Sequence, residues 1–143
     1  MYIKVTDGNG VVYSLQKLRE DNPDQIFPAN MSNEFLAQWD VYPVSVPDAP
    51  QADFMVEYLS QGPFYEANGS WTFDWVKSQV PQDVAERNIR NQRNQLLSNC
   101  DWTQLADTPT DSAPWAIYRQ ELRDLPQQAG FPYSVVWPTE PTS

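Results

Sequence analysis

The feature that most constrains the fold is a predicted helix that has no apolar residue in its middle. Pro81 is well suited to a helix start, and the helical pattern runs to about Ser98, where Asn99 and Asp101 favour capping or a turn. Residues 90–95 are all charged or amide-bearing. Only the two ends of this helix can therefore bury apolar side chains, and its middle must face either solvent or a partner.

The same helix separates two regions of different charge. Residues 1–86 carry 13 acidic and 4 basic side chains, a net charge of −9, whereas residues 87–143 carry 6 and 5, a net charge of −1. We therefore predict two domains, an acidic α+β lobe over residues 1–76 and a helical region over residues 77–143. The predicted fold class is α+β: a small N-terminal lobe of short β-hairpins and short helices, then a C-terminal helical hairpin with an extended Pro-rich tail.

Local signals define the start of the N-terminal lobe. The turn sequence at residues 7–10 lies between two strand-like segments and predicts a β-hairpin. Ser14 is placed to cap one short helix, and a second short helix is expected to begin at Ser32. Between these helices, residues 26–28 are expected to be extended and buried. The segment after the second helix, residues 41–46, reads as a strand, and its proline restricts it to a sheet edge.

Two more short strands are expected at residues 54–59 and 64–67, and Asn68-Gly69 predicts a type I′ turn into a strand at residues 71–76. Three aromatic side chains share one face of that last strand. They either fill a small core or form a stacking platform for glycans, and both interpretations stay open: Trp71, Phe73 and Trp75.

A second C-terminal helix is predicted from the three-four spacing of its apolar residues. Ser112 is placed to cap it, and Pro126 ends it. Its apolar stripe consists of Trp115, Tyr118, Leu122 and Leu125. We expect an Asp101-Trp102 corner between the two helices, with Trp102 packed on the Trp115 and Tyr118 face. The short segment 135–137 is expected to lie back over the helices.

The order of rare residues in this C-terminal block resembles the phage tail assembly chaperone family. The shared pattern is an R-N-x-L-L-x-x-x-D-W helix end, a W-A-x-Y-R-x-x-L-R-D helix and a G-F-P…W-P tail, seen here at residues 93–102, 115–124, 130–132 and 137–138. Residues 18–44 are also similar to an N-terminal region that accompanies this block in phage tail proteins. The resemblance implies a protein of tail or tail-fibre assembly.

From this resemblance we expect a non-enzymatic tail-fibre accessory protein whose partner is a tail-fibre or other tail protein. It would act in the host cytoplasm during assembly, and retention in the virion tail stays open, as does a homo-oligomer that matches the fibre symmetry. The alternative is a carbohydrate-binding module at a fibre tip. The acidic N-terminal half argues against nucleic acid, and the absence of a long apolar run argues against a membrane.

The composition also argues against catalysis. The chain has no histidine, which removes the commonest general base and metal ligand, and it has one cysteine, Cys100, expected to be a small buried residue at a helix end. No Gly-rich phosphate loop is present, and nothing distinguishes a glycosidase-like carboxylate pair. We therefore expect no enzyme activity, no cofactor and no metal site.

Two sets of side chains are candidates for partner binding. The first follows the polar-centred helix at steps of three: Arg87, Arg90 and Arg93. The second lies on the next helix: Tyr118, Arg119 and Arg123. The planar arginine fork suits directed bonds to carboxylates and carbonyls of a partner. Internal pairing of the two later arginines is the alternative, with Asp107, Asp111 or Asp124 as acceptors.

Overall fold

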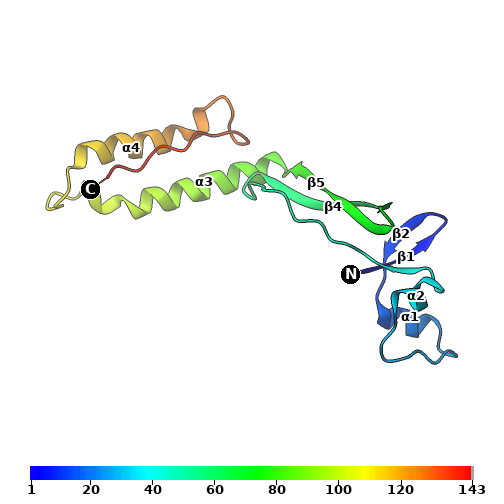
Figure 1. Ribbon diagram of the computed structural model, residues 1–143. Helices are drawn as coiled ribbons and strands as arrows, with labels where there is room; N and C mark the ends of the chain where they lie inside the picture. The colour runs from blue at the N-terminus through cyan, green and yellow to red at the C-terminus, as the bar shows by residue number, and fades with distance from the viewer. Residues whose placement is uncertain (143) are drawn as a thin grey trace. The chain divides into compact units, whose positions relative to one another are not determined.

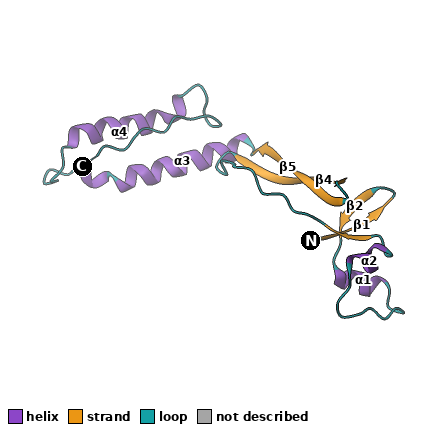
Figure 2. Cartoon of the chain, viewed as in Figure 1, coloured by secondary structure: helices purple, strands orange, loops and turns teal. Residues whose placement is uncertain are grey.

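The computed structural model describes residues 1–142 and confirms the α+β class (Figures 1 and 2). The chain forms two compact units, one of residues 1–51 and 59–77, the other of residues 52–58 together with the chain from Ser78 onwards. The short segment 52–58 thus groups with the C-terminal unit. The predicted boundary between domains 1–76 and 77–143 stays a prediction, because the units describe packing and not independent folding.

The N-terminal unit contains the predicted hairpin, formed by β1 (Tyr2–Thr6) and β2 (Asn9–Val12). Asp7 and Gly8 form its turn with φ of 50° and 78°, a region in which glycine is unstrained. β3 (Val41–Pro43) pairs antiparallel with β1, giving the sheet order β2-β1-β3. Pro43 lies opposite Tyr2 in an edge strand, as predicted from its missing N–H group.

In the N-terminal unit, Ser14 and Ser32 each cap a short helix. The Ser14 hydroxyl accepts a hydrogen bond from Lys17 N in α1 (Leu15–Asp21), and the Ser32 hydroxyl accepts one from Phe35 N in α2 (Asn33–Ala37). Buried side chains from the two helices and β3 form one small core: Leu18, Leu36 and Val41.

The segment between α1 and α2 differs from the expectation. The ring of Phe27 does pack against Phe35 and Trp39, with ring centroids 6.2 and 5.1 Å away. Ile26, however, is 99% exposed, so the expected burial of residues 26–28 is wrong at this position. One aromatic side chain is enough to attach the loop to the core, and its neighbours remain in solvent.

A long antiparallel ribbon replaces the two short strands expected before the Asn68-Gly69 turn. β4 (Glu57–Ala67) is one continuous strand, and β5 (Ser70–Gln79) pairs with it. Phe54 and Met55 are not in a strand, because Asp53 binds this segment into a turn: its carbonyl accepts from Val56 N and its carboxylate from Met55 N. The Asn68-Gly69 turn is confirmed, with φ of 52° and 74°.

The C-terminal unit contains α3 (Gln82–Asn99), a short 3-10 turn η1 (Asp101–Gln104), α4 (Ser112–Asp124) and a second 3-10 turn η2 (Leu125–Gln127). The predicted helices are confirmed, but the cap of α4 is Asp111, whose carboxylate accepts from Ala113 N. Ser112 is already the first helical residue. Asp and Ser have similar capping preferences, so the local sequence did not separate them.

The C-terminal tail returns along both helices, as expected (Figure 1). Val135 and Trp137 pack on two buried clusters, one around α4 and one at the start of α3. Gly130 permits the tight bend into this tail, because an added Cβ there would collide with the carbonyl oxygen of Ser134. The tail therefore fills the space between the two helices and completes both cores.

Candidate functional site

The polar middle of α3 borders an open groove in the C-terminal unit. Along this helix only Ala85 and Ile89, both near its start, are buried. Asn88 donates from its side-chain amide to the carbonyl of Met55 at 2.8 Å, and this bond holds the turn at residues 53–56 beside the helix. The groove has a volume of about 750 Å³ and is lined by Phe54, Met55, Asn88, Asn91, Gln92, Asn94, Gln95 and Ser98.

This groove, called the amide groove below, is lined mainly by side-chain amides. None of its lining residues is charged, although the chain carries a net charge of −10. Each side-chain amide can donate two hydrogen bonds and accept others, as a peptide group also donates and accepts. Phe54 adds an aromatic ring that is 69% exposed at the edge of the groove. Such a surface suits a neutral polypeptide better than an ionic ligand.

The predicted arginine stripe on α3 is partly engaged within the protein. Arg90 forms an ion pair with Glu86 at 2.7 Å, and its guanidinium lies 5.1 Å from the ring centroid of Phe131. Arg93 donates to the side chain of its neighbour Asn94. Arg87 is exposed and makes no hydrogen bond or ion pair within residues 1–142. Whether these arginines contact a partner stays a prediction.

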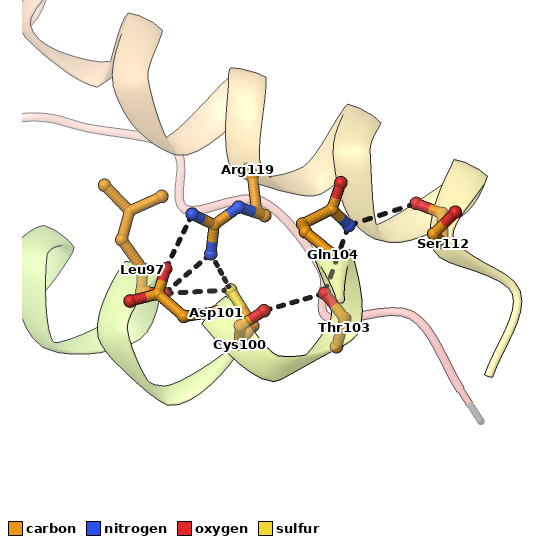
Figure 3. A network of polar contacts seen from close by, with 7 residues as sticks. All are labelled: Leu97, Cys100, Asp101, Thr103, Gln104, Ser112 and Arg119. Atoms are coloured by element: carbon orange, nitrogen blue, oxygen red, sulfur yellow. Dashed lines mark hydrogen bonds and ion pairs between the residues drawn. The ribbon is translucent and has the colours of Figure 1, made fainter. Parts of the chain in front are cut away.

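Arg119 on α4 joins the end of α3 to the corner that follows it (Figure 3). Its guanidinium donates to the carbonyl of Leu97 at 2.7 Å and to the sulfur of Cys100 at 3.2 Å, and it pairs with Asp101 at 2.7 Å. The Arg119 side chain is 12% exposed and that of Asp101 is 65% exposed. This geometry gives Arg119 an internal role with an acceptor set that differs from Asp107, Asp111 and Asp124.

The other two members of the α4 set lie in different environments. Tyr118 is 4% exposed and belongs to the buried cluster around α4, so its ring supports the fold from within. Arg123 is exposed and forms no hydrogen bond or ion pair in the described part of the chain. Helical spacing places Arg119 and Arg123 on one face of α4, but the contacts with the end of α3 and with Asp101 engage only Arg119.

The corner between α3 and α4 is present, but the side chain of Trp102 is more exposed than expected. Trp102 lies in η1 with its ring centroid 6.1 Å from that of Trp115, which in turn contacts Tyr118 at 5.9 Å. Trp115 is 4% exposed, whereas Trp102 is 45% exposed. The contact with the α4 face is therefore made through Trp115, and about half of the Trp102 side chain faces solvent. Cys100 is buried at the helix end, as expected.

The aromatic face of β5 is largely a core. Phe73 is 1% exposed and packs with Ile3 and Val44, so its ring has no free face for a sugar. Trp75 is half-buried, and its indole N–H donates to the carbonyl of Pro47 at 3.0 Å. Trp71 is also half-buried and contacts Tyr42. Of the proposed stacking platform, Trp71 borders a pocket of about 210 Å³.

Residues 1–142 contain neither a candidate metal site nor a candidate membrane span. No cluster of three or more His, Cys, Asp or Glu side chains in this range could hold a metal ion. None of the helices in the same range has the length and hydrophobicity of a membrane span.

Sequence reasoning did not find Phe54 as part of a site, because it assigned this residue to a strand. The polar run at 90–95 was the available signal, and it marked only one side of the groove.

Comparison with known families bears on the same C-terminal region. Residues 86–142 match a family model described as phage tail assembly chaperone protein. The matched region, 57 of the 143 residues, is similar to this family. The match confirms the resemblance drawn from the R-N-x-L-L, W-A-x-Y-R and G-F-P motifs, and it includes most of α3 with the amide groove residues from Asn88 to Ser98. Comparisons with curated proteins and with solved structures found no match.

Proposed function

We propose that the protein is a non-enzymatic tail-fibre accessory protein that binds a fibre or other tail protein and aids its assembly. The observation that carries this proposal is that six of the eight residues lining the amide groove, those from Asn88 to Ser98, lie in the region that matches the chaperone family. The N-terminal similarity over residues 18–44 lies outside the matched region and stays a prediction.

The proposed mechanism is stoichiometric binding of an extended segment of the fibre chain. Unassembled fibre subunits expose apolar side chains and open strand edges, which associate wrongly unless they are covered. The free amides of Asn91, Gln92 and Gln95 can bond to peptide N–H and C=O groups of such a segment. Phe54 would cover an apolar side chain of the same segment. This binding requires no ATP and no chemical step.

The charge distribution is consistent with this mechanism. The groove is neutral, so it can accept segments of varied sequence, while the net charge of −10 keeps the complex soluble and repels further copies. Arg87 and Arg123 are exposed cations that could pair with carboxylates of the fibre protein. Their contribution would be modest, because exposed ion pairs stabilise a complex by about 0–1 kcal/mol each.

Co-expression with the fibre protein of the same phage tests the proposal. A tagged full chain should capture the fibre protein, and Phe54→Ala combined with Gln92→Ala should weaken capture by about tenfold or more. The matched control is Ile26→Ala, which removes an apolar side chain that is 99% exposed and distant in sequence from the groove. Equal capture by the groove variant and the control would refute the groove as the docking site.

Retention in the virion is a separate part of the proposal. A chaperone that dissociates would be present in infected-cell lysate and missing from purified particles, whereas a structural subunit would be found in both. Quantitative mass spectrometry of purified virions separates these outcomes. The measured ratio of this chain to the fibre protein would also give the copy number and reveal an oligomer that matches the fibre symmetry.

A further inference from the structure

We propose that a second site, in the N-terminal unit, binds a single neutral sugar ring. A pocket of about 210 Å³ lies where the start of α2, β3 and the β4–β5 turn meet, and it is lined by Asn33, Tyr42, Pro43, Gly69, Ser70 and Trp71. This volume is below the roughly 300–1,000 Å³ of pockets that hold drug-sized ligands. The ligand would therefore be about one ring in size.

The walls of this pocket, called the Tyr42–Trp71 pocket below, are held by contacts between distant segments. Trp71 forms a parallel bridge with Val44, and its carbonyl accepts from Ser45 N at 2.8 Å. The Thr72 hydroxyl donates to the Ser45 carbonyl, also at 2.8 Å. These bonds bring the Tyr42 and Trp71 rings to a centroid distance of 6.1 Å with 38° between their planes. The two aromatic rings are thus positioned before any ligand arrives.

The polar side chains that line the pocket are not engaged by the described part of the chain. Within residues 1–142 the side chains of Asn33, Tyr42, Ser70 and Trp71 make no hydrogen bond. Trp75 provides the contrast, because its indole N–H is bonded to the Pro47 carbonyl. A tryptophan that serves only as core satisfies its N–H in this way. The Trp71 N–H, the Asn33 amide and the Ser70 hydroxyl are instead available to an external molecule.

The charge of the pocket restricts the class of ligand. No acidic or basic side chain lines it, so neither a cation nor an anion would be neutralised there, and the net charge of −10 further disfavours an anion. A sugar ring has slightly positive C–H groups on one face, which favour the negative face of an aromatic ring. Its hydroxyl groups donate and accept, as the amide and hydroxyl side chains here also do. Aromatic rings combined with neutral polar groups therefore point to a saccharide.

Titration of the full-length protein with methyl glycosides of glucose, galactose and N-acetylglucosamine tests this inference by ¹H–¹⁵N NMR. At least one of them should cause saturable shifts of the Trp71 indole N–H and the Asn33 amide, with Kd on the order of 1 mM for so small a ligand. Asn33→Ala and Ser70→Ala should each weaken binding about tenfold with the spectrum otherwise unchanged. The matched control is Asn30→Ala, an exposed asparagine that does not line the pocket.

Three results would overturn the proposal. The first is the absence of saturable shifts with all three glycosides, and the second is binding that Asn33→Ala and Ser70→Ala leave unchanged. The third is saturation of the pocket by choline or acetate in place of the glycosides, which would assign the aromatic pair to an ionic ligand. Since Trp71 also packs on the core, Tyr42→Phe supplies a further variant that keeps both rings and removes one hydroxyl.

Discussion

The two long helices of the C-terminal unit use their side chains in opposite ways. α4 has 13 residues and buries Trp115, Tyr118 and Leu122 along its length. α3 has 18 residues and buries only Ala85 and Ile89, both in its first half. The shorter helix is therefore held by packing along its length, whereas the longer one packs at its two ends and leaves its polar middle available for contacts outside the protein.

This difference separates the determinants of stability from those of binding. A helix whose surface is committed to the core tolerates few substitutions, because each buried side chain contributes apolar contact area. A helix with a polar, accessible middle can change there at little cost in stability. We therefore expect variants in α4 to affect the fold first and variants in the middle of α3 to affect partner binding first.

The largest effect should come from Leu122→Ala. Leu122 is fully buried in the cluster around α4, and truncation of such a side chain lowers the free energy of unfolding by about 2–5 kcal/mol. Ile117→Ala, on the same helix but 64% exposed, should change it by less than about 1 kcal/mol. Urea denaturation measures both. Equal losses in the two variants would mean that α4 is not packed as described.

Arg119→Ala should have the next largest effect. The substitution removes the guanidinium bonds to the Leu97 carbonyl and to the Cys100 sulfur, at a cost of about 1.5–3 kcal/mol in unfolding free energy. Arg123→Ala, which removes an exposed arginine from the same helix, should stay within about 0.5 kcal/mol. Chemical denaturation compares them. If Arg123→Ala were the more destabilising variant, the internal role of Arg119 would be wrong.

Trp102→Ala should cost about 1–2 kcal/mol in unfolding free energy. A fully buried tryptophan at the corner would give about 3–5 kcal/mol, but the side chain is 45% exposed and contacts α4 through Trp115. Thermal and urea unfolding together test the value. An unchanged stability would leave the whole indole free for a partner, and a loss above about 4 kcal/mol would indicate a closed corner.

The smallest effect concerns the Glu86–Arg90 ion pair on α3. Hydrogen bonds from Arg90 and Gln82 lower the pKa of the Glu86 carboxyl below its usual value. Because the folded-state pKa is the lower one, the pair stabilises the protein above the unfolded-state pKa, and this contribution is lost as pH falls through the folded-state pKa. Glu86→Gln should therefore be slightly less stable than the natural chain at pH 7 and equally stable at acidic pH.

Urea midpoints at pH 7 and at about pH 3 measure this difference, since an ordinary glutamate titrates near pH 4.3. High salt at pH 7 should reduce it as well, because the pair is exposed and screened. A difference that grows as the pH falls would have the opposite sign and would contradict the assignment.

Several elements could be predicted because their signals lie within a few residues of each other. Ser14 and Ser32 cap helices through bonds to residues three positions ahead. Asn68-Gly69 forms its turn because both residues adopt positive φ. The strand expected at Phe54 was wrong, although its signal is also local. The apolar residues suggested a strand, but the carbonyl and carboxylate of the adjacent Asp53 accept hydrogen bonds that favour a turn.

The candidate sites were predicted only in part. The polar run at residues 90–95 identified one wall of the amide groove, and Trp71 was already among the aromatic candidates. Phe54 in the amide groove and Tyr42 in the Tyr42–Trp71 pocket were not predicted, because each is distant in sequence from the residues that it meets there. Helical spacing placed Arg119 and Arg123 on one face, but packing sheltered the first and left the second in solvent.

By itself, the sequence determined most of the helix boundaries and the Asn68-Gly69 turn, which helix has a polar middle, and the similarity of the C-terminal region to a known family. Caps, proline positions and periodicity act through neighbouring backbone groups, so they need no knowledge of the rest of the chain. The tertiary structure alone decided that Arg119 is largely buried, that Trp102 is about half exposed, and which side chains meet at the amide groove and at the Tyr42–Trp71 pocket. These outcomes depend on the packing of segments tens of residues apart, where competition for buried space selects among arrangements that the local sequence permits equally.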